Sequence, residues 1–241
     1  MLQTVLFLLV VLGFNLIQMI GAFAGTMLAM PFSILLIGAE RARVVLNAVS
    51  IYCCVWPILR SGAKICWPEV GKIAFWMLLG ILAAQALLDV LLSPVVLLLY
   101  SLLVIGVALR NFFRQRELAL PKAVDILVLL GAGLVHGAFL SGGSLLVIYA
   151  MRHLREKDVF RATLSVIWLV LNCFLLTVNV LHGGMTGENL RLFLLATPAA
   201  LLGILVGDLL QKRLEGDRFR RFANCLLLLS GAVLLFNCLH G

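Results

Sequence analysis

Charged residues are scarce in this chain. They make up 12% of the 241 residues, whereas soluble domains carry about 25%. Hydrophobic residues make up 63%, and no stretch is polar enough to form a soluble domain, so the composition indicates an integral membrane protein with one membrane domain. Acidic residues are fewer than basic ones, 11 against 19, but the basic residues are spread over short loops. That distribution argues against binding to nucleic acid.

Sequence motifs for cofactors and metals are also missing. The chain has no Walker sequence, Rossmann glycine fingerprint or H-E-x-x-H pattern. Its six cysteines show no C-x-x-C or other metal spacing, and most of them lie in apolar runs. We therefore expect no cofactor, no metal site and no enzymatic activity.

Long runs without charge are present instead. A helix needs about 20 mostly apolar residues to cross a bilayer, and the runs lack the alternation of a membrane barrel, so the sequence predicts an all-α polytopic membrane protein. We expect the first run to be a mature helix and not a signal peptide, because no basic residue precedes it. The eight runs are Met1 to Ala39, Ala42 to Leu59 (interrupted by Arg43), Ile73 to Leu88, Val90 to Leu109, Ile126 to Met151, Ala162 to Gly187, Leu192 to Gly207 and Phe222 to Gly241.

The two halves of the chain resemble each other. Residues 20–23 match 136–139, and residues 78–85 match 201–208 in the same order, with an offset that drifts from about 116 to 123. Internal repeats of this size are typical of secondary transporters, in which the substrate binds at the repeat interface near the membrane midplane. We therefore expect two repeats of four hydrophobic segments, residues 1–115 and 120–241, within one membrane domain.

The distribution of lysine and arginine favours inverted repeats. If all eight segments cross the membrane, the basic residues divide 11 against 8 between its faces. If the segment Ile126 to Met151 enters and returns to the same face, the division becomes 16 against 3. The positive-inside rule then assigns the rich face to the cytoplasm and places both termini outside it. The first segment of each repeat is accordingly predicted to be a broken, re-entrant helix hairpin.

The centre of the segment Ile126 to Met151 is rich in glycine and serine. Glycine permits unusual backbone angles, and broken helices survive at membrane depth only where protein or a water-filled cavity surrounds them. We expect one hairpin apex at residues 141–144 and the other near residues 21–27. The alternative is that these small residues let helices pack closely.

Broken helices offer free N–H groups for a small anion. His136 is a candidate for proton coupling, because the reference pKa of histidine is near 6.5; a neutral ring bonded to a backbone carbonyl is the alternative. Arg161 is expected to anchor the basic face; the alternative is that its guanidinium reaches back towards the hairpin and attracts anions from the cytoplasm. Asp208 is expected to have a structural role near that face. The candidate substrate-binding residues are Gly21, Gly25, Thr26, Asn47, Gly137, Ser141, Gly142, Gly143, Ser144 and Thr163.

The second half is similar to a known family of transporters. The pattern Gly133-x-x-His136-Gly137-x-x-x-Ser141-Gly142-Gly143-Ser144, followed by a short basic loop and residues 161–166, resembles the TauE/SafE sulfite exporter family. With the repeats, the resemblance covers essentially the whole chain. It implies proton-driven export or exchange of small anions, notably sulfite and organosulfonates. In the first half, Thr26-Met27-Leu28 replaces the family's glycine cluster before Pro31, so we expect a less open first hairpin.

These features together predict a secondary active exporter of a small anion, which works by alternating access in a bacterial inner membrane. Its expected partners are the anion and the lipid bilayer. The sequence is compatible with a homodimer but does not predict one. Two alternatives have other functions. One is a passive anion channel, and the other is an intramembrane serine hydrolase that uses Ser141 or Ser144 with His136 or His182.

Overall fold

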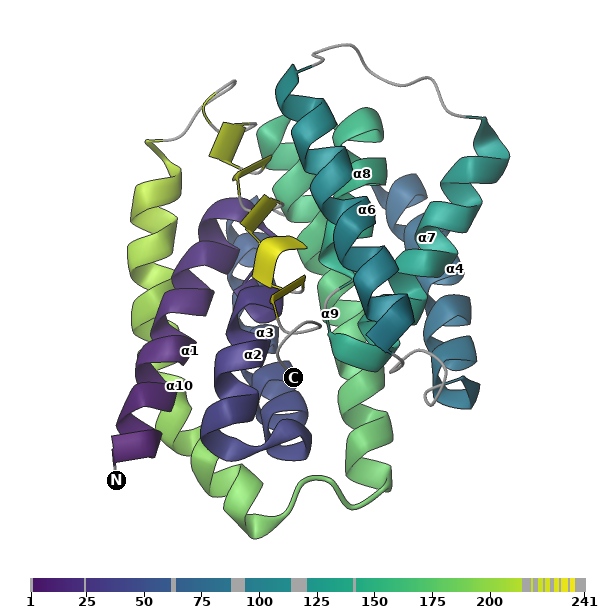
Figure 1. Ribbon diagram of the computed structural model, residues 1–241. Coiled ribbons are helices and arrows are strands. Elements are labelled where there is room, and N and C mark those ends of the chain that lie inside the picture. The colour runs from purple at the N-terminus through teal and green to yellow at the C-terminus, as the bar shows by residue number, and fades with distance from the viewer. Residues whose placement is uncertain are drawn as a thin grey trace.

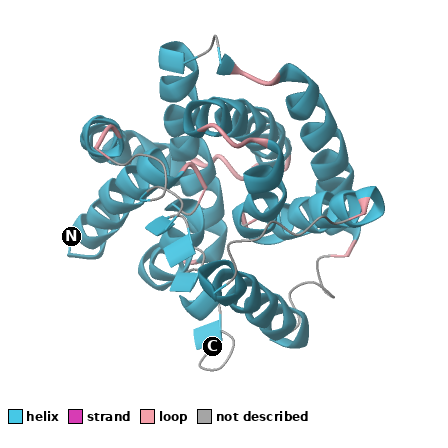
Figure 2. Cartoon of the chain, turned by 90° about the horizontal axis from the view of Figure 1, so that it is seen from above, coloured by secondary structure: helices cyan, strands magenta, loops and turns pink. Residues whose placement is uncertain are grey.

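The computed structural model describes residues 2–23, 25–61, 64–87, 94–113, 121–140 and 142–213, followed by residues 218, 221–222, 224–225, 228–229, 231–233 and 235–236. Across these residues the chain forms helices and loops and no strand, which confirms the predicted all-α fold. Viewed from above, the helices pack side by side (Figure 2). The helices are α1 (Leu2–Gly21), α2 (Gly25–Ile37), α3 (Ala39–Ser61), α4 (Trp67–Ala86), α6 (Pro94–Phe113), α7 (Lys122–Phe139), α8 (Gly143–His153), α9 (Lys157–Leu181) and α10 (Gly187–Gln211).

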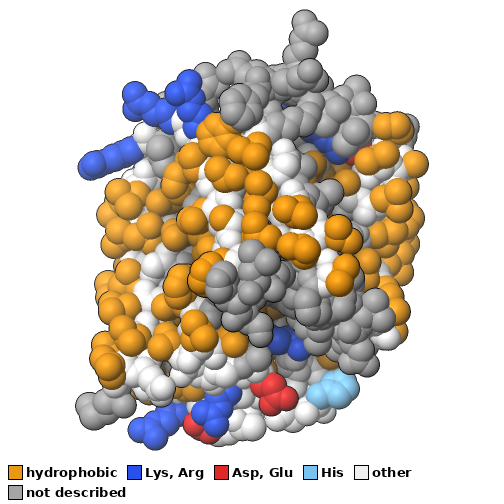
Figure 3. All heavy atoms as spheres, in the orientation of Figure 1, with side chains coloured by type: hydrophobic (Ala, Val, Ile, Leu, Met, Phe, Trp, Pro, Cys, Tyr) orange, Lys and Arg blue, Asp and Glu red, His pale blue; other side chains and the backbone are white. Residues whose placement is uncertain are grey.

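Five of the described helices, α1, α3, α4, α9 and α10, are long and apolar enough to cross a membrane. Their outer faces carry large apolar side chains such as Leu2, Leu59 and Leu181, each more than 70% exposed. Figure 3 shows apolar side chains over the middle of one face, with lysines and arginines towards its upper and lower edges. An exposed apolar band with charge at both edges fits a bilayer, and the chain is an integral multi-pass membrane protein.

Two of the charge-free runs are each divided into two helices. The first run forms α1 and α2, and the run Ile126 to Met151 forms most of α7 and α8. In both pairs the second helix turns back and packs against the first. In Figure 1, α1 rises from the N-terminus and α2 descends beside it, whereas α7 descends and α8 rises.

Helices of the first half pack against helices of the second half. The most extensive contacts join α1 to α10 and α7 to α4, while α3 packs on α9 between these pairs. Glycines bring the backbones together: a Cβ on Gly133 of α7 would lie 2.2 Å from the Met77 carbonyl of α4, and one on Gly203 of α10 would lie 2.4 Å from the Leu12 carbonyl of α1. Small residues at such crossings are a common feature of membrane helix pairs.

Ion pairs gather at the two opposite ends of the bundle. At the upper end in Figure 1 they join the end of α3 to the end of α10 and the loop before α4 to the start of α9. At the lower end, the start of α3 is joined to the start of α10. The pairs are Arg60–Asp208 at 3.0 Å, Lys64–Asp158 at 2.5 Å and, at the lower end, Arg41–Glu188 at 2.5 Å.

A polar network fixes α8 to its neighbours at the upper end. The Tyr149 hydroxyl on α8 donates to Glu69 Oε2 at 2.6 Å and accepts from Lys72 Nζ at 2.7 Å, and both of these partners lie on α4. Arg152 of α8 forms an ion pair with Asp125 of α7. The Tyr149 side chain is completely buried, so these bonds hold α4, α7 and α8 together.

Candidate functional site

The first helix break lies between Gly21, the last residue of α1, and Gly25, the first residue of α2. Ala22 has a left-handed backbone, with φ of +66°. The side chain of Gln18 bridges the break, because its Oε1 accepts a hydrogen bond from the Gly25 N–H at 2.9 Å. A Cβ on Gly25 would lie 2.5 Å from the Phe14 carbonyl, so the close return of the chain requires glycine here.

The second break lies between Phe139 and Gly143, and Leu140 is its left-handed residue, with φ of 54°. A Cβ on Gly142 would lie 2.2 Å from the Ala132 carbonyl. A Cβ on Gly143 would lie 2.7 Å from the Phe23 carbonyl. The start of α8 therefore packs directly against the backbone of the first break, and the two breaks meet.

Contacts around the two breaks recur at a constant spacing in the sequence. Gly25 lies against Phe14 and Gln18, and Gly142 lies against Ala132 and His136. The contacted residues of the second break follow those of the first by 118 positions. The sequence match pairs Ile20 with His136, whereas these contacts make Gln18 the equivalent of His136.

Two arginines, also 118 positions apart, each reach the end of a broken helix in the other half. Arg161 of α9 donates from Nη2 to the Met19 carbonyl of α1 at 2.6 Å. Arg43 of α3 donates from Nη2 to the Gly137 carbonyl of α7 at 3.5 Å. The last carbonyls of a helix lack partners within the helix and carry a partial negative charge, so both guanidinium groups are placed to stabilise a break.

A small cavity lies where the breaks meet, and we call it the central cavity. Its volume is about 10 Å³, which is room for about one water molecule. Trp168 crosses between the halves here, since its Nε1 donates to the Ala22 carbonyl at 2.9 Å. The cavity is lined by Gln18, Phe23, Thr26, Ser50, His136, Leu140, Gly143, Trp168 and Asn172.

His136 is buried in the wall of the central cavity. Its ring centroid lies 5.1 Å from that of Trp168, and Asn172 is the polar side chain that interacts with it. Neither ring nitrogen has a hydrogen-bond partner of good geometry among the described residues. Unpartnered buried polar groups are costly, so this ring is a candidate for a contact made in another state or with a ligand.

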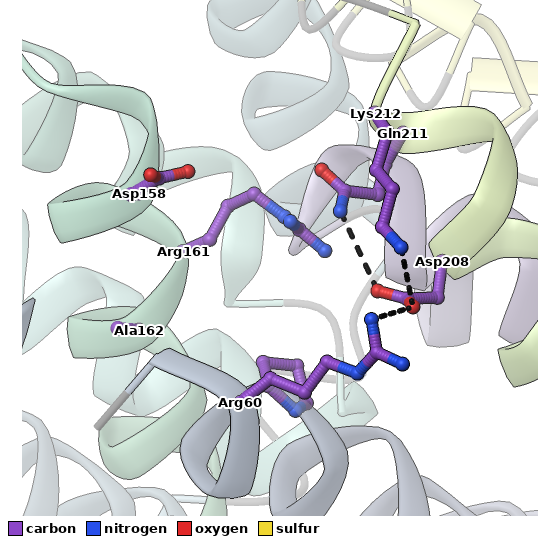
Figure 4. Close-up of a pocket in the computed structure, with 8 residues that line it drawn as sticks. Arg60, Asp158, Arg161, Ala162, Asp208, Gln211 and Lys212 are labelled. Carbon is purple, nitrogen blue, oxygen red and sulfur yellow. Dashed lines mark hydrogen bonds and ion pairs between the residues drawn. The ribbon is translucent and has the colours of Figure 1, made fainter.

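A second, larger cavity of about 220 Å³ lies between α3, α9 and α10 at the upper end of the bundle. Figure 4 shows Arg161 extending from α9 towards the side where Arg60, Asp208 and Lys212 gather. Arg161 is 7% exposed, and its Nε has no hydrogen-bond partner within the described chain. We call this space the upper cavity.

The structure brings some of the predicted site residues together. Thr26, His136 and Gly143 line the central cavity, and Gly21, Gly25 and Gly142 belong to the breaks themselves. The carbonyl of Gly137 accepts the Arg43 bond. Ser141 lies outside the described residues, and of Ser144 only the backbone, in the first turn of α8, is described.

Two predicted residues lie away from the central cavity lining. Asn47 is completely buried on α3, and neither side-chain atom has a partner in the described part of the protein. The Thr163 hydroxyl accepts a hydrogen bond from the Cys66 N–H at 3.0 Å, just before α4. His182, considered for a hydrolase, is exposed at the end of α9.

Sequence reasoning missed Gln18, Arg43 and Trp168. Gln18 is a polar residue in an apolar run, and a repeat spacing of 118 would have paired it with His136. The same spacing would have paired Arg43 with Arg161. Apolar segments match each other easily, so the sequence was matched at offsets of about 116 and 123. At those offsets, neither the Gln18–His136 pair nor the Arg43–Arg161 pair is aligned.

Comparison with known proteins identifies the family of this chain. The family model described as "Sulfite exporter TauE/SafE" matches residues 6–234, nearly the whole chain. Curated proteins and solved structures gave no match. The match confirms the family resemblance. The chain therefore belongs to the TauE/SafE sulfite exporter family of membrane transporters.

Proposed function

We propose that the protein is a secondary active exporter of a small anion, such as sulfite or an organosulfonate, driven by protons. The observation that carries the proposal is the meeting of two helix breaks, one from each half, around the central cavity. Secondary transporters place substrate at such broken helices, where half-helix N-termini point at anionic groups. Family membership supports an anion as the substrate class.

The two halves act as inverted repeats in this proposal. Reciprocal packing of α1 on α10 and of α7 on α4 supports it, as do the contacts that recur 118 positions apart. In Figure 1 the first hairpin opens towards the lower end and the second towards the upper end. Each hairpin would enter and leave the membrane on one face, and the end with more basic residues would face the cytoplasm.

The donors for the anion come from both breaks. α2 begins at Gly25 and α8 at Gly143, so each helix directs its positive dipole end and the N–H groups of its first turn towards the breaks. The Gly25 N–H among them is already bonded to Gln18. Thr26 adds a hydroxyl to the lining. A volume of about 10 Å³ is too small for a sulfite ion, so this conformation is closed, and binding would require the hairpins to separate.

Flux measurements on protein reconstituted in liposomes test this proposal. We expect saturable sulfite transport that responds to a pH gradient and is accelerated by unlabelled sulfite on the opposite side of the membrane. Acceleration of this kind is a property of carriers and not of channels. No flux of sulfite, methanesulfonate or sulfate under any gradient would contradict the proposed function.

Replacement of Thr26 by valine should reduce the flux at low sulfite concentration roughly 10- to 100-fold, because a hydrogen bond to a charged group contributes about 1.5–3 kcal/mol to binding. Valine keeps the shape of threonine and removes the hydroxyl. Thr177→Val is the matched control, since Thr177 lies exposed on α9 and its hydroxyl donates only to the Cys173 carbonyl. Equal flux in the two variants would rule out Thr26 as a ligand.

A further inference from the structure

We propose that the upper cavity is a second anion site, in which the Asp208 carboxylate occupies the place of the transported anion until the anion displaces it. This inference rests on the proposed function for the class of ligand, a small oxyanion. The site would receive the anion at the end of the bundle that carries most basic residues, before the anion reaches the central cavity.

The charges that line the upper cavity support an anion. Three cationic side chains, Arg60, Arg161 and Lys212, face this space together with two carboxylates. One carboxylate, Asp158, is held by Lys64 outside the cavity at 2.5 Å. Among the described residues, three cations therefore face two carboxylates, one of which already pairs with Lys64, so the cavity has an excess of positive charge.

Asp208 is bound as a small oxyanion would be. Its Oδ2 lies 3.0 Å from Arg60 Nη1 and 3.9 Å from Lys212 Nζ, and its Oδ1 accepts from Gln211 Nε2 at 3.4 Å. The Asp208 side chain is only 8% exposed. Arginine and lysine are the usual ligands of oxyanions in proteins, so the groups that hold this carboxylate can hold sulfite or a sulfonate instead.

Arg161 supplies the unsatisfied donor in this cavity. Its Nη2 donates to the Met19 carbonyl, but its buried Nε has no partner within the described residues. A buried N–H on a charged group is costly to leave without an acceptor. An anion in the upper cavity, which has a volume of about 220 Å³, would provide that acceptor and would also place charge beside the end of α1 at the first break.

Calorimetric titration of the purified protein with sulfite and with methanesulfonate tests the inference. Asp208→Asn removes the competing carboxylate with little change of shape, and we expect the affinity for sulfite to rise roughly fivefold. Arg161→Gln should lower it at least about tenfold. Arg41→Gln is the matched control, because Arg41 lies exposed at the lower end of the bundle and pairs with Glu188, and it should bind sulfite like the wild type.

A second pair of variants keeps the test valid if Arg161→Gln fails to fold. Lys212→Gln and Arg213→Gln change the net charge equally at neighbouring exposed positions, but only Lys212 lines the cavity. We expect about a threefold loss of affinity for Lys212→Gln and none for Arg213→Gln. Equal affinities in these two variants, or no gain of affinity in Asp208→Asn, would overturn the inference.

The flux assay separates failure of this inference from failure of the proposed function. Thr26→Val, which acts at the central cavity, should lower flux and leave sulfite binding at the upper cavity unchanged. Sulfite transport by the wild type with no effect of Asp208 or Lys212 on binding would overturn the second site and leave the transporter in place. Binding with the expected pattern but without flux would support the site and contradict the transporter.

Discussion

Replacement of His136 by glutamine should leave anion exchange intact and remove its response to a pH gradient. Among the described residues that line the central cavity, His136 is the titratable side chain apart from hydroxyl groups. The described lining contains no carboxylate, so a charged imidazole buried at this position would cost several kcal/mol. Proton uptake and release at the ring would therefore accompany opening and closing of the cavity, and a glutamine cannot take part in either.

The fold should accept glutamine at this position. The equivalent residue in the first half is Gln18, whose Oε1 accepts a hydrogen bond from the Gly25 N–H at the start of α2. A glutamine at position 136 can bridge the second break in the same way. We expect exchange at equal pH to stay within about twofold of the wild type and flux driven by a pH gradient to fall at least about tenfold.

The measurement is sulfite flux in liposomes, with and without a pH gradient across the membrane. His182→Gln is the matched control, because His182 lies exposed at the end of α9, and we expect wild-type flux from it in both conditions. Proton-driven flux that persists at its full rate in His136→Gln would show that another group carries the proton.

Replacement of Gly133 by alanine should produce a large loss of stability. The new Cβ would lie 2.2 Å from the Met77 carbonyl and 2.8 Å from the Met77 Cα. Both neighbours are backbone atoms of α4, so no side chain can turn away, and the two helices must separate. Overpacking of this kind costs about 1–3 kcal/mol, and we expect a loss at the upper end of that range.

Gly131→Ala is the matched control on the same helix. A Cβ there would make an ordinary contact at 3.5 Å with Leu145 Cδ1, and alanine in a helix is favoured over glycine by about 0.5–1 kcal/mol. Denaturant titration in detergent micelles should show a lower unfolding midpoint for Gly133→Ala and an unchanged or higher one for Gly131→Ala. Equal midpoints would contradict the close crossing of α4 and α7.

The helical fold and the positions of both breaks could be predicted from the sequence. Run length and hydropathy determine which segments can cross a bilayer, and glycines near residues 21–25 and 142–143 identify where the helices end. These are local properties of the chain. They do not depend on which segments come together in space.

The partners of the site residues could not be predicted, because they depend on packing between distant segments. Arg161 begins a charge-free run, and its position there suggested an anchor at the surface, yet it lies buried against Met19 of α1. Thr163 was expected at the anion site, but its hydroxyl accepts from the Cys66 N–H. Polar atoms in an apolar segment bond to whichever backbone group lies nearest, and hydropathy does not reveal that group.

The bonds of Tyr149 to Glu69 and Lys72 have a mechanical consequence. Because they fix α8 to α4, and the Arg152–Asp125 pair fixes α8 to α7, we expect the second hairpin to move together with α4. Hinge and shear motions take place where few bonds join one such group of helices to another. The bonds from Arg161 and Trp168 join α9, which lies outside this group, to the first break, so in the proposed transport cycle their breakage would contribute to the energy barrier.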